Sequence, residues 1–276
     1  MIIRKKLIKF DQINKERMNV PISDGMNFDQ IDVKPFSIVI PFSSARLESL
    51  KFSLDRLNRC VGIDKCEIVL VLYQNEFVDH DFAEYSNLNL NIVHSKRNND
   101  QNLFCLSHAR NIGLKQATHD WTLMMDADII CPENMCKVLS HPMMRNVNCI
   151  YCTDRINFAS REDLVQVDEK KILGVDNSFV GFFHFFCKKR IDDLVGGYDE
   201  TMLSWGREDC DLMMRSQMFG MKVIHLKNNL PVYHVVHDYD TVEWKIEGSD
   251  ERNHTKQILN ALTKTLRMKD VGNIIQ

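Results

Sequence analysis

Two aspartates, Asp126 and Asp128, directly follow an apolar run at residues 121–125. On extended backbone, residues two apart point to the same side, so both carboxylates can face one ligand. Like charges at a strand end repel unless a cation lies near them, and oxygen ligands of this kind suit Mg²⁺ or Mn²⁺. Such an ion could also hold a diphosphate. An isolated Asp-x-Asp triplet is common by chance, but the strand before this one favours a metal site over solvated loop carboxylates.

A second acidic group stands at the start of a predicted helix and consists of Glu208, Asp209 and Asp211. Acids favour helix N-termini because of the helix dipole, by about 0.3–1 kcal/mol each, and that alone would explain the carboxylates. It does not explain Trp205 and Gly206 just before them, since a tryptophan ring stacks on sugar faces and glycine permits close approach. A carboxylate beside them could take a proton from an acceptor hydroxyl, a general-base step worth about 10²–10⁴-fold in rate.

Two histidines, His234 and His237, follow in the last part of the chain. A neutral imidazole is a good ligand for a divalent transition metal, and one added to the aspartates would shift the preference from Mg²⁺ toward Mn²⁺. The alternative is a structural histidine with a hydrogen-bonded ring, which is the commoner state of a single histidine. The residues alone leave open which of the two binds metal.

The remaining polar candidates are Arg46, which follows the first apolar run, and Arg110 with Asn111, in the helical segment before the aspartates. Arginine at these positions could bind phosphate oxygens. A solvated helix face explains these side chains equally well, so both interpretations stand.

The elements that must position these residues alternate along the first half of the chain. The predicted strands of this half are 36–42, 67–73, 88–94 and 121–125, and its predicted helices are 47–60 and 107–117. This alternation predicts a doubly wound α/β sheet, in which ligands bind beyond the carboxyl ends of the strands. Asp126 and Asp128 fall at such an end. The less regular second half has predicted strands at 149–153, 179–187 and 221–226 and predicted helices at 208–219 and 255–268.

The composition fits one large globular domain. The chain has 276 residues, of which 44% are hydrophobic and 26% charged, and its formal net charge is −3. A slightly acidic balance argues against nucleic acid as the main partner. The nine cysteines are irregularly spaced and mostly lie inside apolar runs. They favour reduced, buried thiols in a cytosolic protein.

The N-terminal segment 1–17 is basic and partly apolar. It lacks the apolar core of a signal peptide, and the chain has no apolar run of about 18 residues, which a spanning helix would need. A surface segment packed on the domain is the favoured interpretation, and contact with an anionic membrane surface is the alternative. The expected location is the cytoplasm, with peripheral attachment at the inner face of the membrane as a variant.

In order and spacing, these motifs resemble a GT-A fold glycosyltransferase of the family 2 type. The second half is similar to the galactosyltransferase C-terminal region shared by animal β-1,4-galactosyltransferases, polypeptide N-acetylgalactosaminyltransferases and bacterial chondroitin polymerases. The most specific part is Gly-Gly-Tyr-Asp-Glu at 196–200, followed by Trp-Gly-x-Glu-Asp-x-Asp-Leu at 205–212. The other matching stretches are 36–46, 107–113 and 121–130. The resemblance implies a single large domain with a Rossmann-like, mixed and mostly parallel sheet flanked by helices.

The resemblance also divides the chain by task. It implies a nucleotide-sugar-binding half at 36–130 and an acceptor-binding and catalytic half at 131–240. The polar composition up to Pro35 indicates an N-terminal extension at 1–35, and apolar periodicity indicates a C-terminal helical segment at 241–276. The residues expected to bind the nucleotide-sugar donor are Pro41, Arg46, Gln74, Arg110, Asn111, Asp126 and Trp205.

By the same resemblance, Asp128 would bind the metal directly, and Asp126 would reach the metal or the ribose. The family's late metal-binding histidine matches His237 best, because the galactosyltransferases place another metal ligand three residues earlier. That earlier position is His234 in this chain.

The resemblance further implies that Asp209 is the catalytic base and Glu208 an acceptor-binding carboxylate. One base with direct attack on the donor carbon implies inversion of configuration. The chain departs from the family at 73–76, where Tyr-Gln-Asn-Glu replaces the paired aspartates that often contact the nucleobase. Arg207 replaces a small residue, which suggests an acidic acceptor such as a uronate or a lipid-linked phosphate.

The leading prediction is an inverting glycosyltransferase that uses Mn²⁺, with Mg²⁺ as the alternative. It would move galactose, N-acetylgalactosamine or a related sugar from a UDP-sugar to a saccharide or lipid-linked saccharide, as in bacterial capsule or lipopolysaccharide synthesis. A sugar nucleotidyltransferase is one alternative, although such enzymes usually carry a glycine-rich loop that residues 41–46 lack. A binding module that has lost activity is the other, and intact Asp126, Asp128, Asp209 and His237 count against it.

Overall fold

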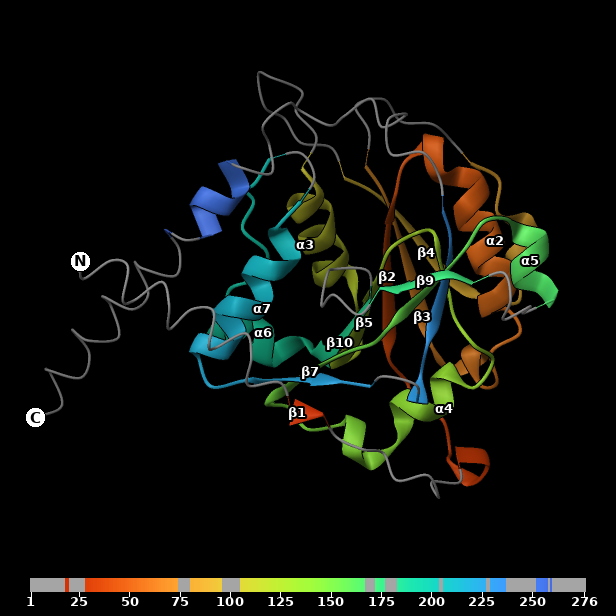
Figure 1. Ribbon diagram of the computed structural model, residues 1–276, viewed down its shortest axis with the longest axis horizontal. Coiled ribbons are helices and arrows are strands. Elements are labelled where there is room, and N and C mark those ends of the chain that lie inside the picture. Colours follow the sequence, from red (N-terminus) through yellow and green to blue (C-terminus); the bar gives the residue numbers. More distant parts are fainter. Residues whose placement is uncertain are drawn as a thin grey trace, which may run out of the picture.

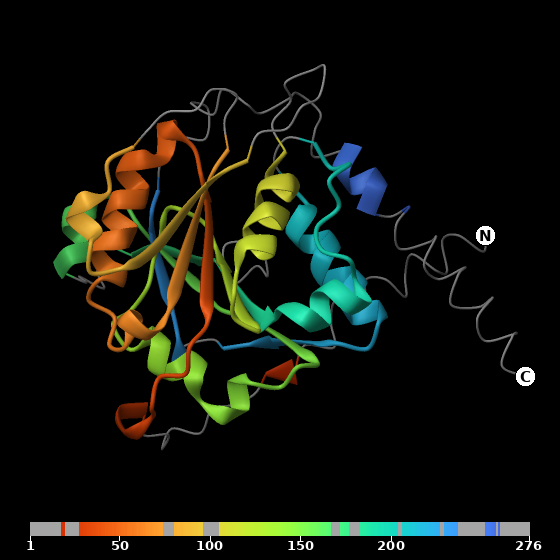
Figure 2. The ribbon, with the colours of Figure 1, turned by 180° about the vertical axis from the view of Figure 1, so that it is seen from behind.

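The structure, a computed structural model, describes residues 18–19, 28–73, 80–95, 105–166, 172–176, 183–203, 206–226, 229–236, 252–257 and 259. Within this part of the chain, the strands form one eight-stranded sheet and one four-stranded sheet. Helices cover both faces of the larger sheet, as Figure 1 shows from one side and Figure 2 from behind.

The larger sheet is mixed but mostly parallel around its centre. Its strands are β1 (Met18–Asn19), β2 (Ser37–Phe42), β3 (Glu67–Leu72), β4 (Asn89–His94), β5 (Trp121–Met125), β7 (Cys149–Cys152), β10 (Phe183–Cys187) and β11 (Lys222–His225). Their order is β1-β11-β7-β10-β5-β2-β3-β4. β2 runs parallel to β3 and β5, and β3 to β4, so four carboxyl ends lie at one edge. Only β10 reverses direction against its neighbours β5 and β7 among the strands described.

Two helical layers bury the larger sheet. The helices of these layers are α2 (Leu47–Leu57), α3 (Leu106–Gln116), α4 (Met135–Ser140), α6 (Lys188–Leu194) and α7 (Glu208–Met218), whereas α5 (Arg161–Gln166) packs on the four-stranded sheet. Ile38 and Ile40 of β2 pack with the leucines of α2, whereas Val39 packs with residues of α3 and α7. In Figure 1, α3, α6 and α7 accordingly lie on the side of the sheet opposite α2. Because both faces are covered, β2 and β3 are buried at every position.

Gly113 sets the distance between α3 and the sheet. A Cβ at this position would overlap the side chain of Val39 and lie 3.0 Å from Cγ2 of Val71. The glycine therefore lets α3 rest directly on β2 and β3. Since α3 leads into β5, its first turns lie at the carboxyl edge of the sheet, next to the end of β5.

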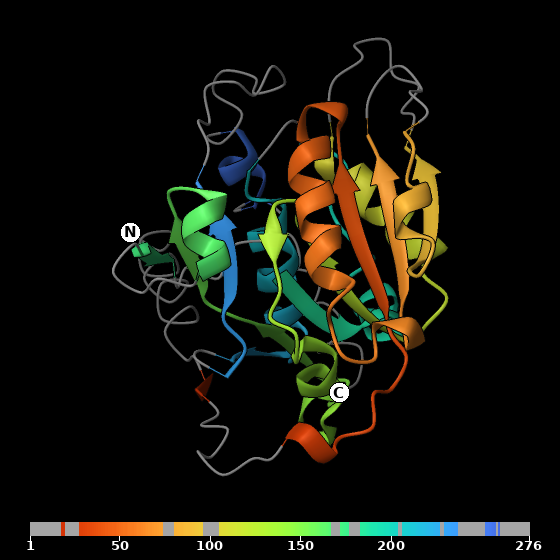
Figure 3. The same ribbon diagram turned by 90° about the vertical axis from the view of Figure 1, so that its right-hand side faces the viewer.

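The smaller sheet begins where β5 ends. Its strands are β6 (Ile129–Ile130), β8 (Arg155–Phe158), β9 (Ile172–Asp176) and β12 (Val232–Val235), in the order β6-β12-β8-β9. β12 pairs antiparallel with β6 and parallel with β8. Figure 3 shows β12 beside β6, with α5 next to them. This sheet brings the last part of the chain back to the residues that follow β5.

The structure confirms the predicted α/β class and most of the predicted elements. The first-half strands and helices occur where the sequence predicts them, and the helix predicted at 208–219 is α7. The predicted strand at 179–187 begins at Phe183 within the described residues. The smaller sheet was not predicted. Residues 252–257 and 259 are helical, and the rest of the predicted helix 255–268 lies outside the described residues.

The structure also bears on the cysteines, the helices and the N-terminal segment. All nine cysteines are free thiols, and only Cys210 among them is not buried. None of the helices in the described ranges has the length and apolar character that a membrane crossing requires. Most of the predicted extension 1–35 lies outside the described residues, but its Met18–Asn19 pairs with β11 as an edge strand.

Candidate active site

Charged side chains meet at the carboxyl edge of the larger sheet. Asp126 directly follows β5, Tyr73 directly follows β3, and Arg46 ends the short turn after β2. Burial raises the pKa of Tyr73 above its usual range, the charges of Asp126 and Asp128 add to that rise, and those of Arg46 and Arg110 oppose it. The phenol therefore lies among four of the residues predicted to bind the donor or its metal.

Arg110 joins the two acidic groups that the sequence analysis identified. Its side chain is only 2% exposed, and its Nη2 lies 3.0 Å from Oδ1 of Asp126. Its Nη1 lies 3.0 Å from Oε1 of Glu208, whose side chain is also buried. One buried guanidinium thus connects the strand-end aspartate to the glutamate that begins α7. A contact between Arg110 and phosphate stays a prediction.

The site carries more negative than positive charge. Burial raises the pKa of Glu208 to about 7, and the charge of Asp209 adds to the rise while Arg110 opposes it. Burial likewise raises the pKa of Asp126 to about 6, with Asp128 and Asp209 adding and Arg110 opposing. Asp126, Glu208 and Asp209 share the buried Arg110, and Asp128 adds a fourth negative charge beside Asp126, so a further cation would stabilise the charged forms of these carboxylates.

The start of α7 holds its carboxylates in a strained turn. Arg207 caps the helix at φ 72°, the only positive φ of a non-glycine residue among those described. Such a conformation costs about 1–3 kcal/mol and is concentrated at functional sites. The backbone N–H of Gly206 donates to Oε2 of Glu208 at 3.0 Å. Asp209 is buried, and its Oδ1 accepts from the backbone N–H of Cys210 at 2.6 Å.

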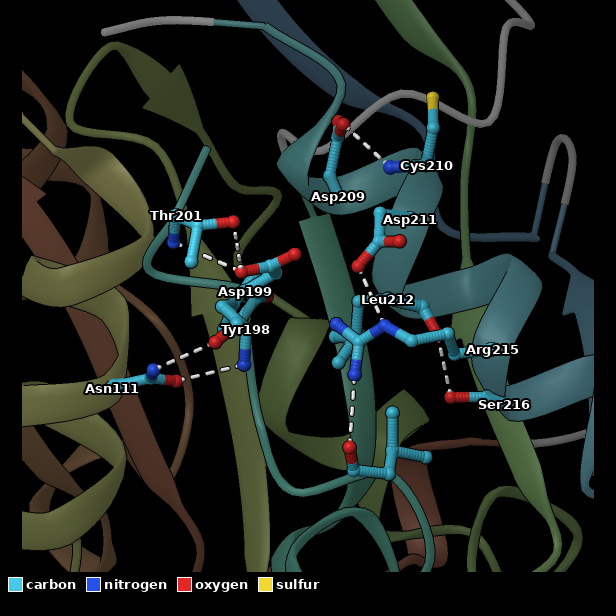
Figure 4. Close-up of polar contacts among 11 residues, drawn as sticks. Asn111, Tyr198, Asp199, Thr201, Asp209, Cys210, Asp211, Leu212, Arg215 and Ser216 are labelled. Carbon is cyan, nitrogen blue, oxygen red and sulfur yellow. Dashed lines mark hydrogen bonds and ion pairs between the residues drawn. The ribbon is translucent and has the colours of Figure 1, made fainter. Parts of the chain in front are cut away.

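Asp211 belongs to the framework of the site. It is fully buried and pairs with Arg215 one turn later, at 2.6 Å between Oδ2 and Nε. Arg215 also donates from Nη1 to the carbonyl of Val195 at 2.9 Å. Figure 4 shows Asp211 directed toward Arg215, whereas Asp209 points away from it. Of the three acids, Asp211 therefore anchors α7, and Glu208 and Asp209 face the site.

The Gly-Gly-Tyr-Asp-Glu segment is tied to α3 through Asn111. The amide of Asn111 donates to the carbonyl of Tyr198 at 2.9 Å and accepts from the N–H of Tyr198 at 2.8 Å (Figure 4). It also donates to Oε1 of Glu200 at 2.9 Å. A Cβ on Gly197, at φ 80°, would lie 2.7 Å from Oδ1 of Asn111. These bonds use both amide hydrogens of Asn111. The predicted contact of Asn111 with the nucleotide stays a prediction. Its observed task is to hold residues 198–200 against α3.

Tyr198 completes the packing around Arg110. The Arg110 guanidinium lies 5.3 Å from the centre of the Tyr198 ring, a distance suited to a cation–π contact. The ring is buried, and burial raises the pKa of its hydroxyl above the usual range while Arg110 opposes the rise. In the sequence, Tyr198 stands out only as part of the Gly-Gly-Tyr-Asp-Glu motif. The two glycines before Tyr198 are the signal in the sequence that the chain passes close to another element, which in the structure is α3.

A metal could be held where the two sheets meet. Oδ2 of Asp128, just before β6, lies 3.6 Å from Nε2 of His234 on β12. Carboxylate and imidazole form a donor set that suits Mn²⁺, and two ligands of one ion are about 3–4 Å apart when each bond is about 2.1 Å. No group of three or more His, Cys, Asp or Glu side chains in the described ranges could hold a metal ion. A diphosphate and water would have to complete the coordination.

The remaining predicted residues divide into two groups. Pro41 is buried in β2, opposite Val71 of β3, at the same edge as Asp126. Gln74, Trp205 and His237 lie outside the described residues, so their predicted contacts stay predictions.

The comparison with protein families identifies one match. A model described as glycosyltransferase-like family 2 matches residues 37–236, which contain every described residue of the site. No protein with a curated functional description matches the sequence.

Solved structures share the fold at low sequence identity. GalNAc-T7 with UDP, GalNAc and Mn²⁺ has a TM-score of 0.60 at 14% identity, over 83% of this chain and 48% of that one. S. aureus TarS 1–349 with UDP-GlcNAc has a TM-score of 0.57 at 15% identity, over 74% of this chain and 59% of that one. The mannosyltransferase PcManGT from Pyrobaculum calidifontis, with GDP-Man and Mn²⁺, has a TM-score of 0.52 at 17% identity, over 95% of this chain and 71% of that one.

These matches establish the architecture. They confirm the predicted GT-A fold, while the chain spans only about half the length of GalNAc-T7.

Proposed function

The chain belongs to the glycosyltransferase-like family 2, and we propose that it is an inverting, metal-dependent glycosyltransferase with a UDP-sugar donor. The observation that carries the proposal is the Arg110 bridge between Asp126 and Glu208. It places a strand-end aspartate typical of nucleotide binding beside a helix-start carboxylate pair suited to an acceptor. The carboxylate proposed for the donor and the carboxylate proposed for the acceptor are therefore joined by one buried arginine.

Asp209 is proposed as the general base. Its carboxylate takes the proton of an acceptor hydroxyl as that oxygen attacks the anomeric carbon of the donor. The bond between this carbon and the diphosphate oxygen breaks on the opposite face, so the configuration inverts and UDP leaves. Glu208, fixed by Arg110 and by the N–H of Gly206, would orient the acceptor hydroxyl toward Asp209.

Asp128 and His234 are proposed to hold the metal, with Asp126 reaching the ribose or the metal. A bound ion would supply positive charge that stabilises the departing diphosphate. Mn²⁺ is proposed over Mg²⁺ because of the imidazole in the donor set. The structures of GalNAc-T7 and PcManGT both contain Mn²⁺ with a nucleotide or nucleotide sugar, which supports the choice.

The donor is proposed to be UDP-galactose or UDP-N-acetylgalactosamine. GalNAc-T7 binds UDP and GalNAc, and TarS binds UDP-GlcNAc, whereas PcManGT binds GDP-Man. Tyr73 stands at the end of β3, where the base contact is expected, and would take part in recognising uracil. The acceptor would be a saccharide or lipid-linked saccharide of a bacterial surface polysaccharide. The enzyme would work in the cytoplasm, with peripheral membrane contact through its basic N-terminal segment as the alternative.

The test is UDP release from a panel of UDP-sugars and GDP-mannose, without acceptor, in Mn²⁺, Mg²⁺ or EDTA. Release from one UDP-sugar that requires Mn²⁺ and disappears in Asp128→Ala is the expected result. Asp120→Ala is the matched control, because Asp120 is an exposed aspartate at the amino end of β5, and it should leave release unchanged.

If the panel gives no release, binding of UDP is measured with and without Mn²⁺. Binding through Mn²⁺ would identify an enzyme that needs its acceptor for turnover. Absence of UDP binding would overturn the donor assignment and direct attention to the base contact at Tyr73.

A further inference from the structure

Asn157 and His234 stand directly opposite each other on neighbouring strands. The parallel register of β8 and β12 pairs these two residues. Oδ1 of Asn157 lies 3.1 Å from Nδ1 of His234, within hydrogen-bond distance. The other ring nitrogen, Nε2, lies 3.6 Å from Oδ2 of Asp128. The buried imidazole is thus held between an amide oxygen on one side and the proposed metal-binding carboxylate on the other.

We propose that Asn157 is a positioning residue that sets the orientation and tautomer of His234 for metal binding. This inference rests on the proposed function, in which Asp128 and His234 hold a divalent cation. Neither the family match nor the motifs of the sequence point to Asn157, which precedes the last residue of a short strand.

The chemistry of imidazole explains why such a residue is needed. A neutral ring carries one proton, on either nitrogen, and only the nitrogen without it can bind a metal. An acceptor oxygen at Nδ1 keeps the proton there, which leaves the lone pair on Nε2. The same hydrogen bond stops the ring from rotating about its side-chain bonds. Partners of this kind typically change metal affinity by about 10–100-fold when they are removed.

Asn157 should also determine which metal binds. Mg²⁺ prefers oxygen ligands, so its binding depends mainly on Asp128 and the diphosphate. Imidazole contributes more to Mn²⁺. Disturbing the ring should therefore weaken Mn²⁺ more than Mg²⁺, and the preference between the two metals should shrink.

The test is calorimetric measurement of Mn²⁺ and Mg²⁺ dissociation constants in the presence of UDP. Asn157→Leu, which has a similar size but no acceptor, should weaken Mn²⁺ binding about 10–100-fold and Mg²⁺ binding much less. Asn157→Asp keeps an oxygen that can only accept, so it should keep Mn²⁺ binding close to wild type. The matched control is Asn91→Leu on edge strand β4, a partly buried asparagine opposite Val69, which should change neither metal.

A double variant shows whether Asn157 acts through the histidine. His234→Ala should itself weaken Mn²⁺ binding, and adding Asn157→Leu to it should cause no further loss, because residues in one network are not additive. Equal Mn²⁺ affinity in wild type and Asn157→Leu would overturn the inference. Loss of Mn²⁺ binding in Asn157→Asp to the same degree as in Asn157→Leu would do so too, since a purely structural role predicts that pattern.

The outcome for the wild-type protein separates this inference from the function it rests on. Wild-type protein that binds UDP but no Mn²⁺ would overturn the metal dependence in the proposed function, and the inference with it. Wild-type Mn²⁺ binding that is lost in Asp128→Ala but unaffected in Asn157→Leu would overturn only the inference about Asn157.

Discussion

Glu67 and Glu208 are both buried glutamates at opposite edges of the same sheet, yet the pKa of Glu67 is lowered and the pKa of Glu208 is raised. Glu67 begins β3 at the amino edge, and its Oε2 accepts from Ser37 at 2.6 Å and from the N–H and hydroxyl of Thr118 at 2.9 and 3.0 Å. Burial acts to raise the pKa of Glu67, but these hydrogen bonds outweigh it and leave the pKa lowered. At the carboxyl edge, burial prevails and raises the pKa of Glu208 to about 7.

The difference separates a carboxylate that stabilises the fold from one that is held ready for a ligand. At Glu67, donors from β2 and the loop before β5 satisfy the negative charge, so the residue fastens three segments together. At Glu208, one arginine, Arg110, is shared with the carboxylates of Asp126 and Asp209. The folded protein therefore keeps negative charge there that it does not fully neutralise. Such incompletely compensated groups are typical of functional sites, where a cation or substrate supplies the missing interaction.

The largest expected effect is on turnover, at the carboxyl edge. Asp209→Asn should lower kcat by about 10²–10⁴-fold, because the amide cannot take a proton from the acceptor. Stability and donor binding should change little, since the asparagine keeps the oxygen that accepts from the N–H of Cys210. Steady-state kinetics with the identified donor and acceptor, together with UDP binding by calorimetry, measures both quantities.

Asp211→Asn is the matched control on the same helix. It removes a carboxylate that pairs with Arg215 inside the protein, so its main effect should be a lower melting temperature. Turnover in Asp209→Asn equal to that of wild type would exclude Asp209 as the base. A loss of UDP binding in Asp209→Asn as large as the loss of turnover would show that the residue belongs to the donor site instead.

The sequence predicted the candidate site best where a carboxylate lies directly beside the end of a predicted strand or the start of a predicted helix. Asp126 follows a buried apolar strand, and Glu208 and Asp209 follow a glycine at a helix start, so their places could be read from neighbours in the chain. The doubly wound sheet followed from the same local patterns, because strands covered on both faces give continuous apolar runs.

The parts that could not be predicted depend on pairing between distant residues. Strands β8 and β12 are short, and the contact between Asn157 and His234 joins residues 77 positions apart. Nothing near Arg110 in the sequence shows that one guanidinium would serve two carboxylates. Arg215, the partner of Asp211, also donates to the carbonyl of Val195 20 positions earlier, and this distant contact is what separates the task of Asp211 from that of Asp209.

The second expected effect is on stability, at the amino edge. Glu67→Gln should lower the free energy of unfolding at pH 7 by about 1.5–3 kcal/mol, the range of hydrogen bonds to charged groups. A lowered pKa means that this contribution is present above the unfolded pKa and is lost as the pH falls through the folded value. Denaturant unfolding of wild type and variant at several pH values measures it, and the two curves should converge in acid. UDP release should stay at the wild-type rate.

The remaining expected effect has the opposite sign and comes from Glu208→Gln. Because the pKa of Glu208 is raised to about 7, the folded wild type binds a proton that the unfolded chain releases between about pH 4.5 and 7. The wild type therefore loses stability as the pH rises through that interval, and a glutamine that mimics the protonated form does not. At pH 8 the variant should be more stable than wild type by an amount on the order of 3 kcal/mol, because a pKa raised from 4.5 to about 7 corresponds to about 1.4 kcal/mol for each unit. At pH 4.5 the two should nearly agree, and turnover should fall at every pH. A variant less stable than wild type at pH 8, like Glu67→Gln, would show that Arg110 fully compensates Glu208 and that the two edges of the sheet do not differ.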